Sequence, residues 1–221
     1  MRQILAILLV CSVLACSQPT AEPAAEQQPG PKPAAKTSGS LPDDWKARFD
    51  HPGPGTDKLR VESGMESLTF SPGPAAIYYK NDMKAEKNYT LSASFSQLTT
   101  LTKPEPYGLI IAGADLDKET ARYTAFLIRA DGKYQITAWT GSTPRVIKDW
   151  TAVPAMREPK GVKTSNTLTI RALQGAVHFL IAERELHQMP RAAAGQDGLA
   201  GVRIGNDLNV QVHNLKLEKN K

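Results

Sequence analysis

Apolar and polar residues alternate with a period of two over much of the chain, which is the pattern of half-buried β-strands. Between residues 89 and 96, four apolar side chains alternate with four hydroxyl side chains. The same alternation recurs at 134–139, 167–172, 177–181 and 210–217. The pattern therefore predicts antiparallel strands that each turn one face toward a core.

Shorter apolar segments complete the set of expected strands. They lie at 45–50, 59–63, 67–71, 76–80, 107–113, 122–129, 145–150 and 199–204. Asp131-Gly132 and Gln174-Gly175 each separate two alternating runs and predict tight hairpin turns. One short helical turn is expected at 192–194. Many short strands with turn residues between them predict an all-β fold, a two-sheet antiparallel sandwich.

The N-terminus has the features of an export signal. Met1-Arg2 precedes an apolar run from Ile4 to Ala15. That run is shorter than the roughly 20 residues of a membrane span and fits the apolar region of a signal peptide. It ends in Val13-Leu14-Ala15-Cys16, which resembles the lipobox of bacterial lipoproteins. The alternative is an ordinary secretory signal that contains a cysteine.

The lipobox resemblance implies a domain organisation and a location. Residues 1–15 would be the signal peptide, and Cys16 would carry the lipid that attaches the protein to a membrane. Residues 16–40 would form the lipidated cysteine and a Pro/Ala-rich disordered linker. The expected location is the cell envelope, and Ser17 favours the outer membrane, facing the periplasm or the exterior. The globular domain would cover 41–218, followed by a tail at 219–221.

Composition narrows the classes of function. The 221-residue chain has a net charge of +5 without any block of like charges, so nucleic acid is not an expected partner. The two cysteines, Cys11 and Cys16, both precede the expected domain. The domain is therefore expected to fold without a disulfide and to use neither a cysteine nucleophile nor a thiolate metal site. The oligomeric state is left open.

A family resemblance rests on several segments taken together. They are Tyr107–Asp115, Tyr123–Tyr134, Trp150, Asn166–Ile170, Gly198–Arg203 and Val210–Leu215. Their succession resembles the concanavalin-A-like (laminin-G-like) jelly roll of exported bacterial proteins, and is most similar to the branch named for 3-keto-disaccharide hydrolases. One departure is the stretch 182–185, where family members usually have an Asn-Gly turn.

The resemblance implies two stacked sheets, one with a concave face on which relatives bind sugars. Alternation then places four candidate binding residues on one face of two neighbouring strands: Tyr123, Arg129, Gln135 and Trp139. Aromatic rings stack on sugars, while arginine and glutamine donate hydrogen bonds to hydroxyls. The alternative is a solvated outer face with one tryptophan covered by a loop.

Catalytic and metal signals are sparse. Glucanases of this fold carry their acids as Glu-x-Asp-x-x-Glu, and this chain contains no Glu-x-Asp. Asp115 and Asp117 are either calcium ligands or an acidic turn, and the turn is favoured because calcium needs six to eight oxygen ligands. The histidines lack zinc spacing. No metal or cofactor is expected.

Three functions remain open. The favoured one is a membrane-tethered envelope lipoprotein whose sandwich binds a carbohydrate or another envelope component. The second is a glycoside hydrolase of the 3-keto-disaccharide type, with acids from separate loops: Asp115, Asp117, Glu183 or Glu185. The third is a structural envelope protein without a small ligand.

Overall fold

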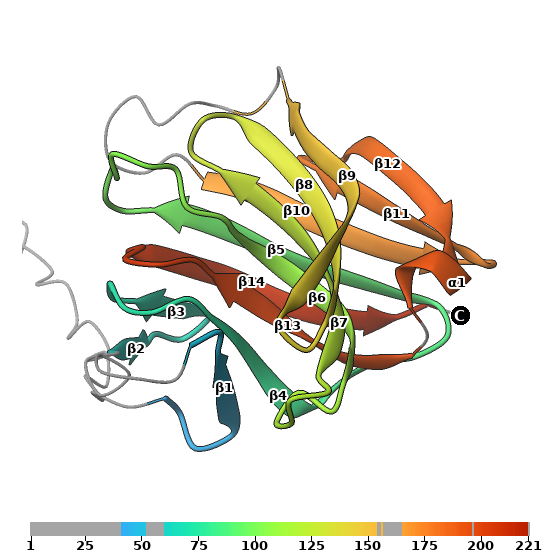
Figure 1. The fold of residues 1–221 in the computed structure, drawn as a ribbon, viewed down its shortest axis with the longest axis horizontal. Helices are drawn as coiled ribbons and strands as arrows, with labels where there is room; N and C mark the ends of the chain where they lie inside the picture. Colours follow the sequence, from blue (N-terminus) through green and yellow to red (C-terminus); the bar gives the residue numbers. More distant parts are fainter. Residues whose placement is uncertain (1–40, 52–59, 154–155, 157–164, 196, 221) are drawn as a thin grey trace, which may run out of the picture. The chain divides into compact units, whose positions relative to one another are not determined.

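The computed structural model describes residues 41–51, 60–153, 156, 165–195 and 197–220. These residues form fourteen β-strands and one four-residue helix. The strands make two antiparallel sheets of seven, stacked on each other (Figure 1). The predicted all-β, two-sheet jelly-roll sandwich is confirmed. Within the described ranges, no helix has the length and apolarity to cross a bilayer.

The first sheet, called sheet I, carries the strands on which the candidate site was predicted. In spatial order its strands are β1 (Trp45–Phe49), β4 (Ala76–Ala85), β13 (Gly198–Ile204), β6 (Tyr107–Ala114), β7 (Arg122–Arg129), β8 (Lys133–Thr140) and β9 (Thr143–Ala152). The strands β6 to β9 follow one another in sequence, whereas the contacts among β1, β4, β13 and β6 join distant parts of the chain.

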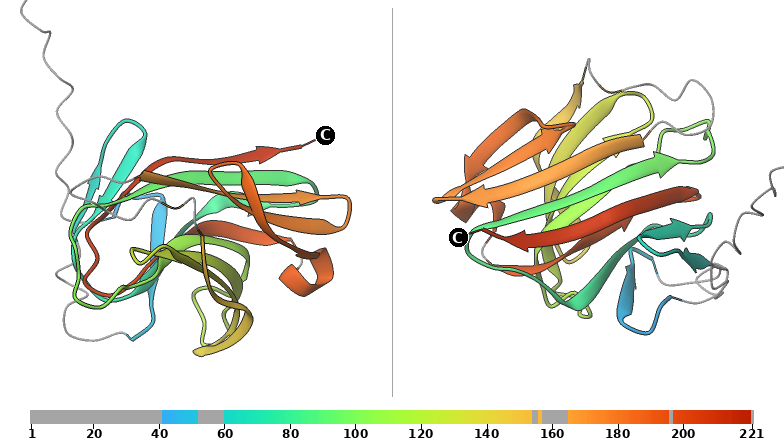
Figure 2. Two further views of the ribbon diagram at one scale, coloured as in Figure 1. Left: turned by 90° about the horizontal axis from the view of Figure 1, so that it is seen from above. Right: turned by 180° about the vertical axis from the view of Figure 1, so that it is seen from behind.

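The second sheet, called sheet II, lies behind sheet I in Figure 1 and faces the viewer in the right-hand view of Figure 2. In spatial order its strands are β12 (Arg184–Pro190), β11 (Ala176–Ile181), β10 (Ser165–Leu173), β5 (Tyr89–Gln97), β14 (Val210–Lys219), β3 (Ser67–Phe70) and β2 (Val61–Ser63). The helix α1 (Arg191–Ala194) follows β12 and confirms the short helical turn expected there.

The main core fills the space between the two sheets. The alternating positions of β5 point into it, and Leu91 and Phe95 are fully buried. Phe126 from sheet I meets Phe179 from sheet II, with ring centroids 5.4 Å apart. On the opposite face of β5, the Ser94 hydroxyl lies 2.7 Å from that of Thr167. The period-two pattern thus assigned the two faces of these strands correctly.

The hairpin turns use backbone conformations that few side chains favour. Gln174 and Gly175 have φ values of 45° and 88°, as expected for a tight two-residue turn. Ala182 and Glu183 form the same kind of turn between β11 and β12, with φ values of 47° and 64°. The departure from Asn-Gly at this position therefore changes the residues but keeps a tight hairpin.

Two strand expectations need correction. β12 was not predicted, because its residues alternate poorly and it lies at an edge of sheet II. β4 continues to Ala85, whereas the prediction ended at Lys80. The extension follows an irregular step, where Leu199 pairs with Lys84 but Gly201 pairs with Tyr79. This bulge bends β4 and obscures its period.

Sheet I also buries apolar side chains on the face turned away from the main core. This outer-face cluster contains Ile77, Tyr79, Ile110, Leu116, Ala121, Tyr123, Ala125 and Leu127. Leu116 and Ala121 come from the segment between β6 and β7. Burial on both faces explains why β6 and β7 are apolar nearly throughout, whereas β5 alternates.

Candidate functional site

The four predicted site residues lie on the outer face of sheet I. Tyr123 and Trp139 are direct cross-strand partners on β7 and β8. Their rings stack with centroids 5.7 Å apart and an interplanar angle of 8°. Arg129 and Gln135 lie toward the other end of the same two strands. The structure therefore joins Tyr123 to Trp139 and separates this pair from Arg129 and Gln135 along the strands.

A buried arginine organises the Trp139 end of the face. Arg203 of β13 is 5% exposed. Its Nη1 donates a 2.9 Å hydrogen bond to Asp50 Oδ1, and its Nη2 donates to Asp50 Oδ2. Nη1 also donates to the Tyr123 hydroxyl at 3.2 Å. Burial disfavours the charge of Arg203, but the Asp50 hydrogen bond raises its pKa, so the guanidinium stays charged.

Arg203 also reaches across the face to Trp139. Its guanidinium carbon lies 4.8 Å from the centroid of the Trp139 ring. β13 and β8 are three strand spacings apart, which is about 14 Å in a flat sheet. Both side chains are long enough to lean across this distance, and sheet I also curves around its outer face (Figure 2). The left view of Figure 2 shows β7, β8 and β9 bending away from sheet II.

A second arginine–tryptophan pair forms at the other end of the face. The Arg129 guanidinium carbon lies 4.1 Å from the centroid of the Trp150 ring on β9. Arg129 donates two hydrogen bonds to Asp131, at 3.1 and 2.7 Å. Burial alone would raise the pKa of Asp131, but the Arg129 hydrogen bond and charge hold it below its usual value. Arg129 and Arg203 are thus each neutralised by an aspartate, whereas Arg48 on the same face donates to the Lys118 carbonyl at 2.7 Å.

Both tryptophans are partly exposed, whereas Tyr123 is 4% exposed. The Trp139 Nε1 donates to the Thr137 hydroxyl at 2.9 Å, which fixes the orientation of the indole. Gln135 donates to Asp149 Oδ1 at 3.3 Å, beside Trp150. Trp139 and Trp150 are therefore the rings that can contact a ligand, and Tyr123 supports Trp139 from beneath.

Sequence reasoning missed three residues of this face: Asp50, Trp150 and Arg203. Arg203 had a usable signal, because a charged residue between Val202 and Ile204 on an apolar strand must be paired if the strand is buried. No local signal identified its partner, because Asp50 lies 153 residues away.

The acids considered for catalysis are distributed over both sheets. Asp115 follows β6 of sheet I and pairs with Lys118 at 2.8 Å, and the hydrogen bond from Lys118 lowers its pKa. Glu183 and Glu185 belong to the β11–β12 hairpin of sheet II. Glu183 lies 3.7 Å from Arg171, and Glu185 lies 2.9 Å from His178. Each of these three acids has a basic neighbour of its own.

Side chains that could bind a metal are dispersed in the part of the chain that the structure describes. There, no three His, Cys, Asp or Glu residues gather into a group that could hold a metal ion. Asp115 and Asp117 belong to the turn that leads from β6 toward β7. In this turn, Lys118 donates a hydrogen bond to the Asp115 carboxylate. This contact is compatible with the acidic turn favoured from the sequence.

Comparison with known proteins places the chain by fold. No protein-family model matches the sequence, and no curated protein matches it. Among solved structures, the carbohydrate-binding module CBM66 from Bacillus subtilis superposes with a TM-score of 0.58 and 11% identity, covering 84% of this chain and 99% of that one. The Bacillus licheniformis β-glucanase gives a TM-score of 0.55 and 6% identity, covering 82% and 95%.

Two further solved structures superpose on this chain over a similar share of its length. A family 7 alginate lyase bound to its product gives a TM-score of 0.53 and 11% identity, covering 80% of this chain and 95% of that one. A Bacillus subtilis protein described as having a galectin-like fold gives 0.53 and 13%, covering 80% and 89%. At these identities the likeness concerns the fold: the domain is a concanavalin-A-like jelly roll.

Proposed function

We propose that the domain binds a carbohydrate chain on the outer face of sheet I. The observation that carries this proposal is the pair of partly exposed tryptophans, Trp139 and Trp150, on one concave surface. Each ring has an arginine against it, and each arginine is held by an aspartate. Rigid aromatic rings on a concave surface suit the flat apolar faces of sugar rings.

Charge on this surface favours a neutral glycan. The aspartates Asp50 and Asp131 compensate the guanidinium groups of Arg203 and Arg129. An anionic sugar would have to compete with these bidentate pairs, whereas neutral hydroxyls can share the remaining donors and acceptors. Gln135 and Asp149, beside Trp150, supply an amide and a carboxylate of this kind.

The two tryptophans also suggest a ligand longer than one sugar. Trp139 and Gln135 are four positions apart on β8, and Gln135 contacts Asp149 next to Trp150. Four positions along a strand cover about 13 Å. A ligand that contacts both rings must extend along β8, so an oligosaccharide fits this face better than a monosaccharide.

Binding is favoured over hydrolysis by the placement of the acids. A glycosidase needs two carboxyl groups roughly 5–10 Å apart around one bond. Glu183 and Glu185 are on a hairpin of sheet II, away from the proposed face, and Asp115, Glu183 and Glu185 are each engaged by a basic side chain. The structural neighbours include a carbohydrate-binding module as well as a β-glucanase and an alginate lyase. They support a carbohydrate ligand in general, and the 3-keto-disaccharide branch remains a prediction from the sequence.

The proposal includes attachment to the cell envelope. Val13-Leu14-Ala15-Cys16 supports acylation of Cys16, and the Pro/Ala-rich stretch after it supports a tether. These residues lie outside the described part of the structure. A lipid on Cys16 would keep the sugar-binding face near envelope polysaccharides. Ser17 directly after the cysteine favours the outer membrane as the location.

A glycan array probed with the full chain in detergent tests the function. We expect binding to neutral oligosaccharides, and Trp150→Ala should weaken it. Trp45→Ala is the matched control, because Trp45 lies on β1 and contacts Lys80 rather than the proposed site. An array without neutral glycan signals, or equal losses in both variants, would contradict binding on this face.

A further inference from the structure

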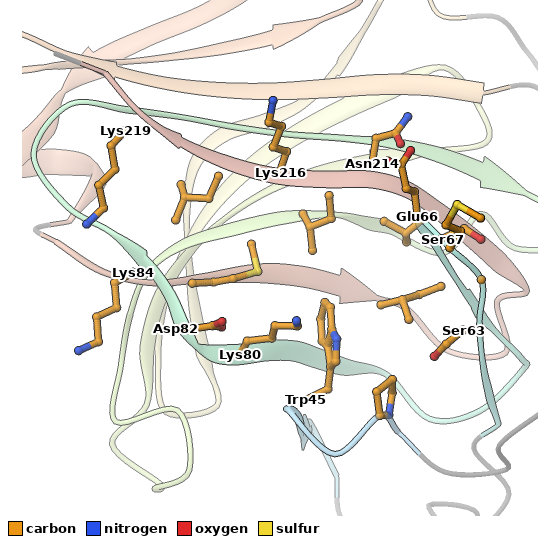
Figure 3. A pocket seen from close by; sticks show the side chains of 18 residues that line it. Trp45, Ser63, Glu66, Ser67, Lys80, Asp82, Lys84, Asn214, Lys216 and Lys219 are labelled. Carbon is orange, nitrogen blue, oxygen red and sulfur yellow. The ribbon is translucent and has the colours of Figure 1, made fainter. Parts of the chain in front are cut away.

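A groove separates β14 of sheet II from β4 of sheet I (Figure 3). Its volume is about 910 Å³. Four apolar side chains form part of its lining and pack against the main core while remaining partly exposed: Leu68, Met83, Leu215 and Leu217. Trp45 points into the groove from the β1 side in Figure 3. The groove thus exposes an apolar surface at the open side of the sandwich.

The β14 strand presents an open edge along this groove. β3 pairs with β14 from Val210 to His213. Lys216–Lys219 then pair with β5 on one side, and no described strand pairs with them on the other. Asn214 lies where the pairing ends, with a φ of 51° and its N–H donating to Glu66 O at 2.9 Å. The main chain of this edge is therefore available beside the apolar lining.

The groove carries more positive than negative charge. Its lining contains Lys80, Lys84, Lys216 and Lys219 and two acids, Glu66 and Asp82. Lys80 pairs with Asp44. Lys216 pairs with Glu218 at 2.5 Å, and Lys219 pairs with Glu86 at 3.6 Å. These pairs are exposed, so each contributes little and can be exchanged for another carboxylate.

We propose that this groove binds an extended acidic peptide by strand addition. The peptide main chain pairs with Lys216–Lys219 and continues the line of β3. Every second side chain of the peptide packs on Met83, Leu215 and Leu217, acidic side chains in between meet Lys216, and the acidic end of the peptide meets Lys219. The open edge covers about 13 Å, so four to six residues of the peptide are enough.

Two other ligands fit the observations less well. An acyl chain would cover the apolar lining. It would also displace water from the unpaired N–H and C=O groups of β14, and those groups would then have no hydrogen-bond partner. A polysaccharide would place hydroxyl groups against Leu215 and Leu217. Pairing with the same edge of a second copy would bring lysines against lysines, which discourages it. An acidic partner does not meet this repulsion and is therefore favoured.

Fluorescence anisotropy with a labelled peptide of four Val-Glu repeats tests the proposal on the full chain. We expect saturable binding, and Lys216→Glu with Lys219→Glu should weaken it about tenfold or more. The matched control is Lys46→Glu with Lys103→Glu, which changes the net charge equally at exposed positions outside the groove. Thermal melts of both double variants should match the wild type.

A second peptide separates strand addition from simple attraction. In it, alternate amides are N-methylated, so that one edge of the peptide keeps its charge but loses its donors. We expect it to bind at least about tenfold more weakly, and hydrogen exchange at Lys216–Lys219 should slow only with the unmodified peptide. Equal binding of both peptides, equal loss in both double variants, or unchanged exchange would overturn the proposal. Glycan binding on the outer face of sheet I should persist in every variant, so this result is independent of the proposed function.

Discussion

Arg203 places its guanidinium carbon 4.8 Å from the centroid of the Trp139 ring, although β6 and β7 lie between their strands. The contact exists because sheet I curves and because Asp50 holds the arginine from its other side. Asp50, which follows β1, thereby influences the position of the Trp139 ring on β8. The concave face is organised around this chain of contacts.

The Asp50–Arg203 pair should contribute measurably to stability. We expect Asp50→Asn to lower the free energy of unfolding by about 2 kcal/mol, because it leaves the Arg203 charge buried without its partner. Asp50→Asn combined with Arg203→Met should cost less than the sum of the two single variants. Urea denaturation followed by tryptophan fluorescence measures all three. Strict additivity would show that the two side chains do not interact energetically.

Trp139 should contribute to sugar affinity beyond its role in packing. Trp139→Ala is expected to weaken binding of an oligosaccharide selected on the array by about 1 kcal/mol, or about fivefold. Trp139→Phe should recover part of the loss, because a smaller ring still stacks. Isothermal titration gives the affinities, and circular dichroism checks the fold. Wild-type affinity in the alanine variant would place the ligand elsewhere.

Alkaline pH should destabilise the domain through its buried tyrosines. Burial raises the pKa of Tyr89, Tyr107 and Tyr123 to about 12 each, against about 10 in an unfolded chain. The folded state therefore keeps protons that the unfolded state has lost. The tyrosine contribution to stability should be constant below about pH 10, and stability should decrease as pH rises from 10 toward 12. Urea titrations at several pH values, with absorbance at the tyrosinate band, test this; a flat profile over that range would contradict it.

The β11–β12 turn offers a stabilising substitution. Glu183 has a φ of 64°, which is unfavourable for a side chain and natural for glycine. Its ion pair with Arg171 is long and exposed, so little is lost with the carboxylate. We expect Glu183→Gly to raise the free energy of unfolding by about 0.5–1 kcal/mol. Glu218→Gly, on β14, is the control and should be destabilising. A loss of stability in Glu183→Gly would contradict the turn geometry.

Acylation of Cys16 is tested by metabolic labelling with palmitate. We expect the wild type to incorporate label and to fractionate with membranes, because a lipoprotein cysteine carries more than one chain and each buried methylene contributes about 0.8 kcal/mol. Cys16→Ser should lose both properties, while Cys11→Ser, upstream in the apolar run, should keep them. Label on Cys16→Ser, or none on the wild type, would leave an ordinary secreted protein.

The sequence by itself determined the strand content, the inward faces and the tight turns, because these depend on residues close together in the chain. Leu91 and Phe95 alternate with hydroxyl residues, so their burial followed from a period of two. β12 was not predicted from the sequence, because its apolar and polar residues alternate poorly. It is an edge strand with a neighbour on one side only.

Only the tertiary structure decided which strands became neighbours and how strongly sheet I curves. The Arg203–Asp50 pair and the groove beside β14 join segments that are far apart in the chain. Alternation assigned Tyr123, Arg129, Gln135 and Trp139 to one face, but it could not show which rings stay exposed. Exposure depends on strand order and sheet curvature, which arise from hydrogen bonds and packing between distant segments rather than from local sequence period.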